Sequence, residues 1–389
     1  MKRILSVILI FTVVSTFMFG CAKPAPAPTP APAPAPTPAP APAPSPQVST
    51  SGPSTFKLKF TTNFGEKHDL SVASKLFMDE VTKRTDGQVT FRSYFGGALG
   101  GAKEVLHYAK DGIVDFCSFL PAYYPGEFNL AQVTGVPYTG YETDARQKTI
   151  IQLLEEIPEL EEEFSAVNVK VLFPATANAN ALVAKERIDT VDDLKGLKIR
   201  GAGYELVAME YWGATPVAIS FGEISDSLSR GVIDAALGMP PQTFVTIGAH
   251  ETCEYFVDPG YGSTGCLYSV MNLDSYNDLP PDIRKVFDEV GEMVAGKYMD
   301  IRMAGIRKAI PKILAAGGEI YALSDETQTQ LEALAKEATF ERWVSDRVED
   351  GASEDLARKT LARFMELVEE YRPESTFKEM VEMYETEFK

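Results

Sequence analysis

Beyond the first 55 residues, stretches with the periodicity of strands alternate with stretches that have the periodicity of helices. Apolar and polar residues alternate over residues 56–61, which is the pattern of a half-buried strand, and apolar residues recur at helical spacing from about His68. A second strand is expected at 88–94, and a helix near 101–110 with a strand at 113–120 repeats the unit. This alternation predicts an α/β fold whose ligand sites lie at the carboxyl ends of strands.

The same alternation continues through the middle of the chain with shorter elements. A long acidic helical segment, 142–164, should break at Pro158, because proline lacks the N–H that an uninterrupted helix needs. The strands expected after it are 169–173, 181–185, 197–200, 215–219, 232–237 and 266–271, and the helices are 204–212 and 221–230.

One helix is expected to be much longer than the others. Its pattern runs from Pro281 to about Ala315, and Pro311 should bend it or end its regular part. At 1.5 Å per residue the helix would be on the order of 50 Å long, the length of two small lobes together. Residues 325–389 are also helical in pattern.

The N-terminal segment has the pattern of an export signal. Lys2 and Arg3 precede an apolar run, 4–19, that is too short to span a membrane, since a spanning helix needs about 20 apolar residues. The Gly20-Cys21 junction that follows resembles a bacterial lipoprotein signal, so we expect Cys21 to be lipidated and to anchor the chain at the outer face of a membrane. Simple secretion and a retained anchor are the alternatives.

Residues 22–55 are expected to be a disordered linker. Proline occurs at every second position from Pro24 to Pro46. Such a sequence favours polyproline II at about 3.1 Å per residue, so these residues would hold the domain on the order of 70 Å from the bilayer.

The remainder of the chain is large and acidic. It is longer than one hydrophobic core usually supports, which favours two lobes. The formal net charge is -18, and all 55 acidic residues but only 34 of the 37 basic ones follow residue 55, so this part carries 34 minus 55, or -21. Such a charge argues against nucleic acid and anionic lipid surfaces as partners.

Motifs for catalysis and for metals are few. Cys117, Cys253 and Cys266 allow at most one disulfide, between the last two, and Cys117 fits a small buried thiol. His250 lacks the second histidine of a zinc-protease helix. Gly260, Gly262 and Gly265 satisfy G-x-G-x-x-G, but a strand pattern follows them where a dinucleotide site needs a helix, so a hinge-side loop is favoured. No enzymatic activity, cofactor or metal site is predicted.

Arg200 is the strongest candidate for ligand recognition. It ends a short strand, and the flexible Gly201-Ala202-Gly203 follows it. A guanidinium is always charged and offers a planar fork of donors that matches a carboxylate. The alternative is a surface salt bridge.

With this segment the chain resembles the dicarboxylate-binding family of substrate-binding proteins of tripartite ATP-independent periplasmic (TRAP) transporters. The similarity covers about Phe56 to Ala316 and is carried by residues 98–100, 110–115, 193–200, 212–217, 220–224, 229–234 and 279–281. It implies two α/β lobes joined by crossing strands, a long helix along both lobes, a cleft that closes on a small organic acid, and a membrane permease as partner. It also implies that Arg200 binds the carboxylate.

The chain departs from this family at two places. Residues 235–240 lack the family's asparagine. The family often has a second arginine some twenty residues before the first, whereas this chain has Asn178 and Asn180 in that region. We therefore expect a ligand with one carboxylate group that is bound by one arginine. The apolar remainder of the ligand would lie against large side chains, which could equally belong to the core. The candidates are Phe119, Tyr123, Tyr124, Phe221, Met239 and Tyr261. His68, which follows the first strand, is a further candidate contact.

The expected organisation places lobe I at 56–175 and 266–305, lobe II at 176–265 and 306–330, and a helical extension at 331–389. The hinge would lie near 174–178 and 262–266. A binding protein for a neutral or cationic nutrient, in which Arg200 pairs with a protein carboxylate, is the second hypothesis. A secreted hydrolase is a third, which the motif search disfavours.

Overall fold

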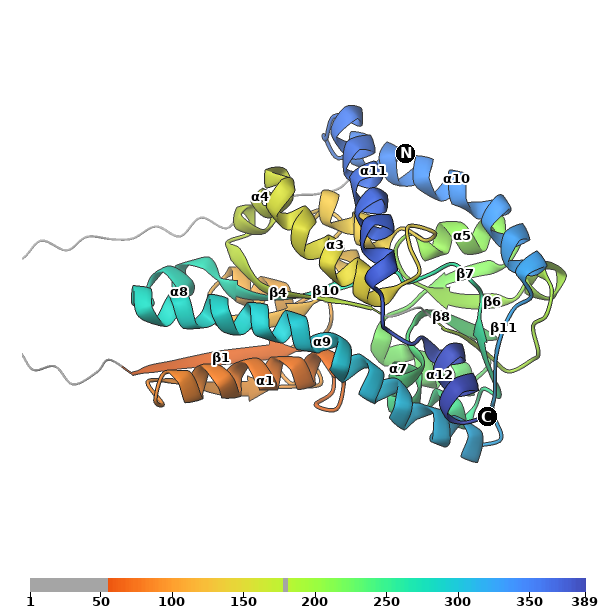
Figure 1. Ribbon diagram of the computed structural model, residues 1–389, viewed down its shortest axis with the longest axis horizontal. Coiled ribbons are helices and arrows are strands. Elements are labelled where there is room, and N and C mark those ends of the chain that lie inside the picture. The colour runs from red at the N-terminus through yellow and green to blue at the C-terminus, as the bar shows by residue number, and fades with distance from the viewer. Residues whose placement is uncertain (1–54, 178–180) are drawn as a thin grey trace, which may run out of the picture. The chain divides into compact units, whose positions relative to one another are not determined.

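Two mixed β-sheets form the framework of the described residues, 55–177 and 181–389, in a computed structural model of the chain (Figure 1). The predictions for residues 1–54, including the signal peptide, Cys21 and the linker, lie outside this range. Asn178 and Asn180 also lie outside the described residues.

The first sheet has five strands in the order β2-β1-β3-β10-β4. Strand β1 runs parallel to β2 and β3, whereas β10 is antiparallel to both β3 and β4. The strands are β1 (Phe56–Thr62), β2 (Val89–Tyr94), β3 (Phe116–Phe119), β4 (Val169–Thr176) and β10 (Cys266–Asn272). All seven residues of β10 are buried, including the polar Ser269 and Asn272.

The second sheet has six strands in the order β11-β9-β5-β8-β6-β7. Strand β5 is antiparallel to β8 and β9, and the other neighbours are parallel. The strands are β5 (Ala181–Ala184), β6 (Lys198–Gly201), β7 (Thr215–Ala218), β8 (Ala235–Met239), β9 (Tyr255–Asp258) and β11 (Glu319–Ala322). Strands β9 and β11, which have four residues each, were not predicted from the sequence.

Helices cover both sheets. They are α1 (Asp69–Arg84), α2 (Val105–Lys110), α3 (Thr143–Glu156), α4 (Pro158–Ala166), α5 (Glu205–Tyr211), α6 (Ile224–Ser229), α7 (Pro241–Thr246), α8 (Leu273–Asn277), α9 (Pro281–Ala315), α10 (Asp325–Glu349), α11 (Glu354–Tyr371) and α12 (Met380–Glu387). Short 3-10 helices are η1 (Pro121–Tyr123), η2 (Leu130–Gly135), η3 (Val191–Leu194), η4 (Phe221–Glu223), η5 (Ala249–Glu251) and η6 (Arg372–Glu374). The break between α3 and α4 falls at the predicted proline, Pro158.

The long helix α9 passes both sheets (Figure 1). It packs against α1 beside the first sheet and against α7 and α12 beside the second. The helix does not end at Pro311 but continues to Ala315. No helix within the described ranges is long and apolar enough to span a membrane.

The chain passes between the two sheets at adjacent places. Strand β4 ends at Thr176, which pairs with Cys266 at the start of β10, and the Ala177 N–H donates to the Gly265 carbonyl at 3.2 Å. The α/β fold with two lobes, crossing strands and a spanning helix is therefore confirmed. In the C-terminal region, α10 packs on α5 and α11 packs on α3.

The suggested disulfide does not form. Cys253 and Cys266 are both free and buried, because Cys253 packs in a core formed by α7, β9 and α9, whereas Cys266 begins β10 in the first sheet. Cys117 is a buried free thiol, as predicted. Burial raises the pKa of Cys253 to about 12 and raises the pKa of Cys117 still further.

Candidate functional site

A pocket lies between the two sheets, at the carboxyl ends of several strands. It contains about 840 Å³ of empty space, part of which is open to solvent. Its walls come from the segments that follow β1, β3, β6, β7 and β8 and from the middle of α9. The strand ends are where the α/β pattern predicted a ligand.

Arg200 is buried at this pocket. Arg200 belongs to β6, which lies between β8 and β7. Its guanidinium donates from Nη1 to the carbonyl of Leu237 in β8 and from Nε to the carbonyl of Ile219, which follows β7, both at 3.2 Å. Only 2% of Arg200 is exposed. In the described part of the chain, no carboxylate oxygen lies within 4.0 Å of its guanidinium. Two of its five N–H donors are engaged by these carbonyls. Because Arg200 is buried and bonds to backbone carbonyls, it does not form the surface salt bridge that was the alternative.

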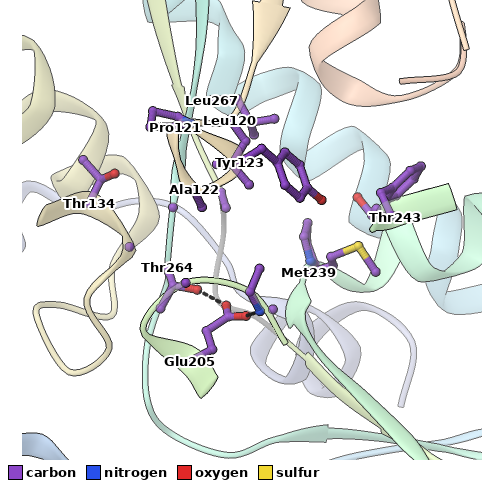
Figure 2. A pocket seen from close by; sticks show the side chains of 18 of the residues that line it. Leu120, Pro121, Ala122, Tyr123, Thr134, Glu205, Met239, Thr243, Thr264 and Leu267 are labelled. Atoms are coloured by element: carbon purple, nitrogen blue, oxygen red, sulfur yellow. Dashed lines mark hydrogen bonds between the residues drawn. The ribbon is translucent and has the colours of Figure 1, made fainter. Parts of the chain in front are cut away.

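Glu205 stands next to Arg200 and is also buried. The Ala202 N–H donates to one carboxyl oxygen at 3.0 Å, and the hydroxyls of Tyr261 and Thr264 donate hydrogen bonds to the other. Figure 2 shows Glu205 with its contact to Thr264. Burial raises the pKa of Glu205, and the nearby Arg200 partly opposes this. The carboxyl group fits against Gly238, where a Cβ atom would lie 2.0 Å from its oxygen. Glycine is required there, and its φ of +90° is also unfavourable for other residues.

A second arginine reaches the pocket from α9. Arg302 is 1% exposed, and its Nη2 atom donates to the Thr176 carbonyl at 3.0 Å. Its Nη1 atom lies 3.5 Å from the Asp69 carboxylate, which also accepts from the Gln242 side chain at 2.8 Å. Burial raises the pKa of Asp69, while Arg302 opposes the shift. The expectation of one arginine in the pocket was therefore incomplete.

Aromatic rings from both sheets meet at the pocket. Phe64 and His68 follow β1 and stack with ring centroids 4.3 Å apart. Phe221 follows β7 and meets Phe64 edge to face at 5.6 Å. Burial lowers the pKa of His68 to about 3, and Arg302 adds to the shift, so this imidazole is neutral at physiological pH. The arrangement forms an apolar wall.

Tyr123 and Met239 project into the same space from opposite sides, with the tyrosine hydroxyl directed toward Met239 (Figure 2). Of the residues proposed from the sequence, the structure brings five to the pocket: Arg200, His68, Tyr123, Phe221 and Met239. Among the described side chains, no group of three or more His, Cys, Asp or Glu residues is arranged to hold a metal ion.

Three residues named from the sequence are not among those that line this pocket. Phe119 and Tyr124 do not line the pocket, because Phe119 is fully buried against Phe128 and the Tyr124 hydroxyl donates to the Ala102 carbonyl. Tyr261 stands one layer behind the pocket, where it supports Glu205.

Sequence reasoning missed Arg302 and Glu205. Arg302 lies four residues after Tyr298 and four residues before Ile306. At this helical spacing the three side chains share one face of α9, so the sequence placed a charge on the apolar face of the helix. That signal could have been used. Glu205 stands in the first turn of a short helix, where acidic residues are common, and nothing in the sequence indicated its burial.

A pocket between two α/β lobes that are joined by crossing strands is the architecture of a two-lobed binding protein. The sequence profile of the bacterial extracellular solute-binding protein family 7 matches residues 60–346. The chain belongs to this family, and the resemblance to TRAP substrate-binding proteins indicated by its motifs is confirmed.

Individual relatives support the same assignment. The monocarboxylate 2-oxoacid-binding periplasmic protein of Nostoc sp. (strain PCC 7120) is 26% identical over 323 residues, which is 80% of this chain and 85% of the relative. The crystal structure of a TRAP solute-binding protein from Rhodoferax ferrireducens T118, in complex with copurified benzoate, superposes with a TM-score of 0.75 at 27% identity. That match covers 83% of this chain and 100% of the other.

Proposed function

We propose that this protein captures a small organic acid with one carboxylate and an apolar remainder, and that Arg200 binds the carboxylate. The observation that carries the proposal is a buried guanidinium at the pocket, held by the Leu237 and Ile219 carbonyls, with no carboxylate within 4.0 Å among the described residues. Two of the five N–H donors of this guanidinium are engaged by these carbonyls. Its planar fork of donors would match the carboxylate of an acidic ligand.

The apolar wall of Phe64, Phe221 and Met239 gives the remainder of the acid its environment. The ligands named for two relatives, monocarboxylate 2-oxoacids and benzoate, each have one carboxylate. Asn178 and Asn180, which lie outside the described residues, remain candidate polar contacts from the sequence.

The ligand is bound without a chemical reaction in this proposal. The lobes would close on it about the two crossings, and the closed form would deliver it to a TRAP-type membrane permease. Mass spectrometry of the bound acid after incubation and release should return its mass unchanged. A changed mass would contradict the binding role.

Calorimetry with purified protein tests the ligand class. A panel of benzoate, 4-methyl-2-oxopentanoate, succinate, glucose and choline separates single carboxylates from dicarboxylates and from neutral and cationic compounds. We expect a single carboxylate to bind most tightly. Preference for glucose or choline would instead support a neutral or cationic nutrient as the ligand.

Two arginine variants test the contact. Arg200→Ala should weaken binding of the preferred acid by about 2–5 kcal/mol, or roughly thirtyfold or more, because a buried charge pair loses one partner. The control is Arg230→Ala, at an exposed arginine that pairs only with Asp226 among the described residues. Equal affinity of Arg200→Ala and the parent protein would refute the proposed contact.

Membrane attachment is a separate proposal that rests on the sequence alone. We infer that Cys21 carries the lipid and that residues 22–55 serve as the tether. The Cys21→Ser protein should appear in the soluble fraction of fractionated cells, whereas the parent stays with the membranes. Parent protein in the soluble fraction would refute lipid anchoring.

A further inference from the structure

The charges at the pocket cancel before any ligand arrives. Arg200 and Arg302 are cations, and Glu205 and Asp69 are acids, so the four groups sum to zero when both acids are ionised. His68 adds no charge, because burial and the neighbouring Arg302 lower its pKa to about 3. All four charged residues are less than 9% exposed.

A bound carboxylate disturbs this balance. It would leave a net charge of -1 among groups that water barely reaches, and uncompensated buried charge is expensive. The ligand would also compete with Glu205 for Arg200. The Arg200 guanidinium donates to Leu237, and the Glu205 carboxyl lies against the next residue of β8, Gly238, so the two side chains approach the same stretch of backbone.

We propose that Glu205 takes up one proton from solvent when a monocarboxylate binds at Arg200, so that the closed site holds a neutral acid beside the new ion pair. This deepens the proposed function and rests on it. The proton bonds to a Glu205 carboxyl oxygen and no other bond changes. Glu205 thereby makes the site selective for singly charged acids, because a dianion would leave a charge of -1 even after the uptake.

The surroundings of Glu205 favour this proton site. Among the described residues, the groups that face its carboxyl include Arg200 from β6, Tyr261 and Thr264 from the segment before β10, and the Ala202 N–H. On the side of β8 the carboxyl lies against Gly238. Burial is the main influence on the pKa of Glu205, and it raises this pKa. A ligand carboxylate would raise it further, because like charges repel.

Asp69 is the competing proton site, and its contacts argue against it. Its cationic partner is Arg302, which donates to the Thr176 carbonyl and is not the arginine proposed to bind the ligand. The Gln242 amide also donates to Asp69 at 2.8 Å. Asp69 therefore keeps its charge partner when the ligand occupies Arg200.

Calorimetry can count the proton directly. Benzoate and 4-methyl-2-oxopentanoate are titrated into the full-length protein in buffers of different ionisation enthalpy at several values between about pH 5.5 and 8.5, where both acids are ionised. The bound state holds more protons than the free state, so the affinity falls as the pH rises through the pKa of Glu205. We expect an uptake between zero and one proton and a loss of affinity of at most tenfold per pH unit.

The Glu205→Gln variant should bind without proton uptake and with a flat pH profile. Its amide oxygen can accept from the Ala202 N–H, and its NH2 group can donate to the Tyr261 and Thr264 hydroxyls, so the local structure is kept. The control is Asp258→Asn, which removes a buried acid outside the pocket that is bonded to Tyr141 and Gly260. That variant should take up the proton as the parent does.

A second variant serves if Glu205→Gln does not fold. Thr264→Val removes a donor that stabilises ionised Glu205, so the fall in affinity should move to higher pH. Binding without proton uptake in the parent, or uptake that persists in Glu205→Gln, overturns the inference while the proposed function stands. Failure of every acid to bind at any pH overturns both.

Discussion

The guanidinium of Arg302 lies 3.5 Å from the carboxylate of Asp69, and both side chains are buried beside the pocket. The pair joins the first residue of α1 to the middle of α9. It therefore ties the start of the first lobe to the helix that passes both sheets.

Breaking this pair should destabilise the protein. Arg302→Met leaves Asp69 without its cation, and we expect a loss of about 3–5 kcal/mol in the free energy of unfolding. The double variant Asp69→Asn/Arg302→Met removes both charges and should be more stable than the single variant. Urea denaturation measures the difference. A single variant as stable as the parent would show that the ion pair contributes nothing.

Two glycines of α9 should respond to alanine in opposite directions. A Cβ atom at Gly291 would lie 2.2 Å from the Leu172 carbonyl oxygen, so Gly291→Ala should force α9 away from β4 and destabilise the fold by more than 1 kcal/mol. At Gly296 no atom lies within 4 Å of the added carbon among the described residues. There alanine should stabilise by about 0.5–1 kcal/mol through helix propensity. Thermal unfolding separates the two, and a Gly291→Ala variant as stable as Gly296→Ala would contradict the close packing.

Phe221 is expected to contribute to ligand binding more than to stability. Its ring is only partly buried and meets Phe64 across the pocket at 5.6 Å. Phe221→Ala should weaken binding of benzoate by roughly tenfold, since an aromatic contact is worth about 0.5–1.5 kcal/mol beyond its buried area. Phe221→Leu should retain more of the affinity. Unchanged binding in both variants would place the ligand away from this wall.

The three thiols of the domain should be inert in the folded state. Cys117, Cys253 and Cys266 are free and buried, and burial raises the pKa of each. In a Cys21→Ser background, a thiol reagent at pH 8 should label them only after denaturant is added, because thiolates are the reactive form. Reducing agent should not change the melting temperature. A drop on reduction would indicate a disulfide after all.

The order of strands and helices could be predicted from the sequence, because the periods of 2 and 3.6 residues are local properties of the chain. Long elements such as α9, and the break at Pro158, followed directly from them. The strands β9 and β11 did not, since they are defined by pairing with each other and with β5, which lie far apart in the chain. The lobe limits and the ligand contacts of the site remain predictions.

The sequence by itself determined the fold class, the family and the role expected of Arg200, because each can be inferred from local periodicity and short motifs. Only the tertiary structure decided which aromatic side chains reach the pocket: Tyr123 and Phe221 do, whereas Phe119 is core. It also brought Glu205 and Arg302 to the same space as Arg200 from separate helices. The helical period could have indicated that Arg302 is buried, but the charge balance depends on neighbours far apart in the chain, which no local pattern specifies.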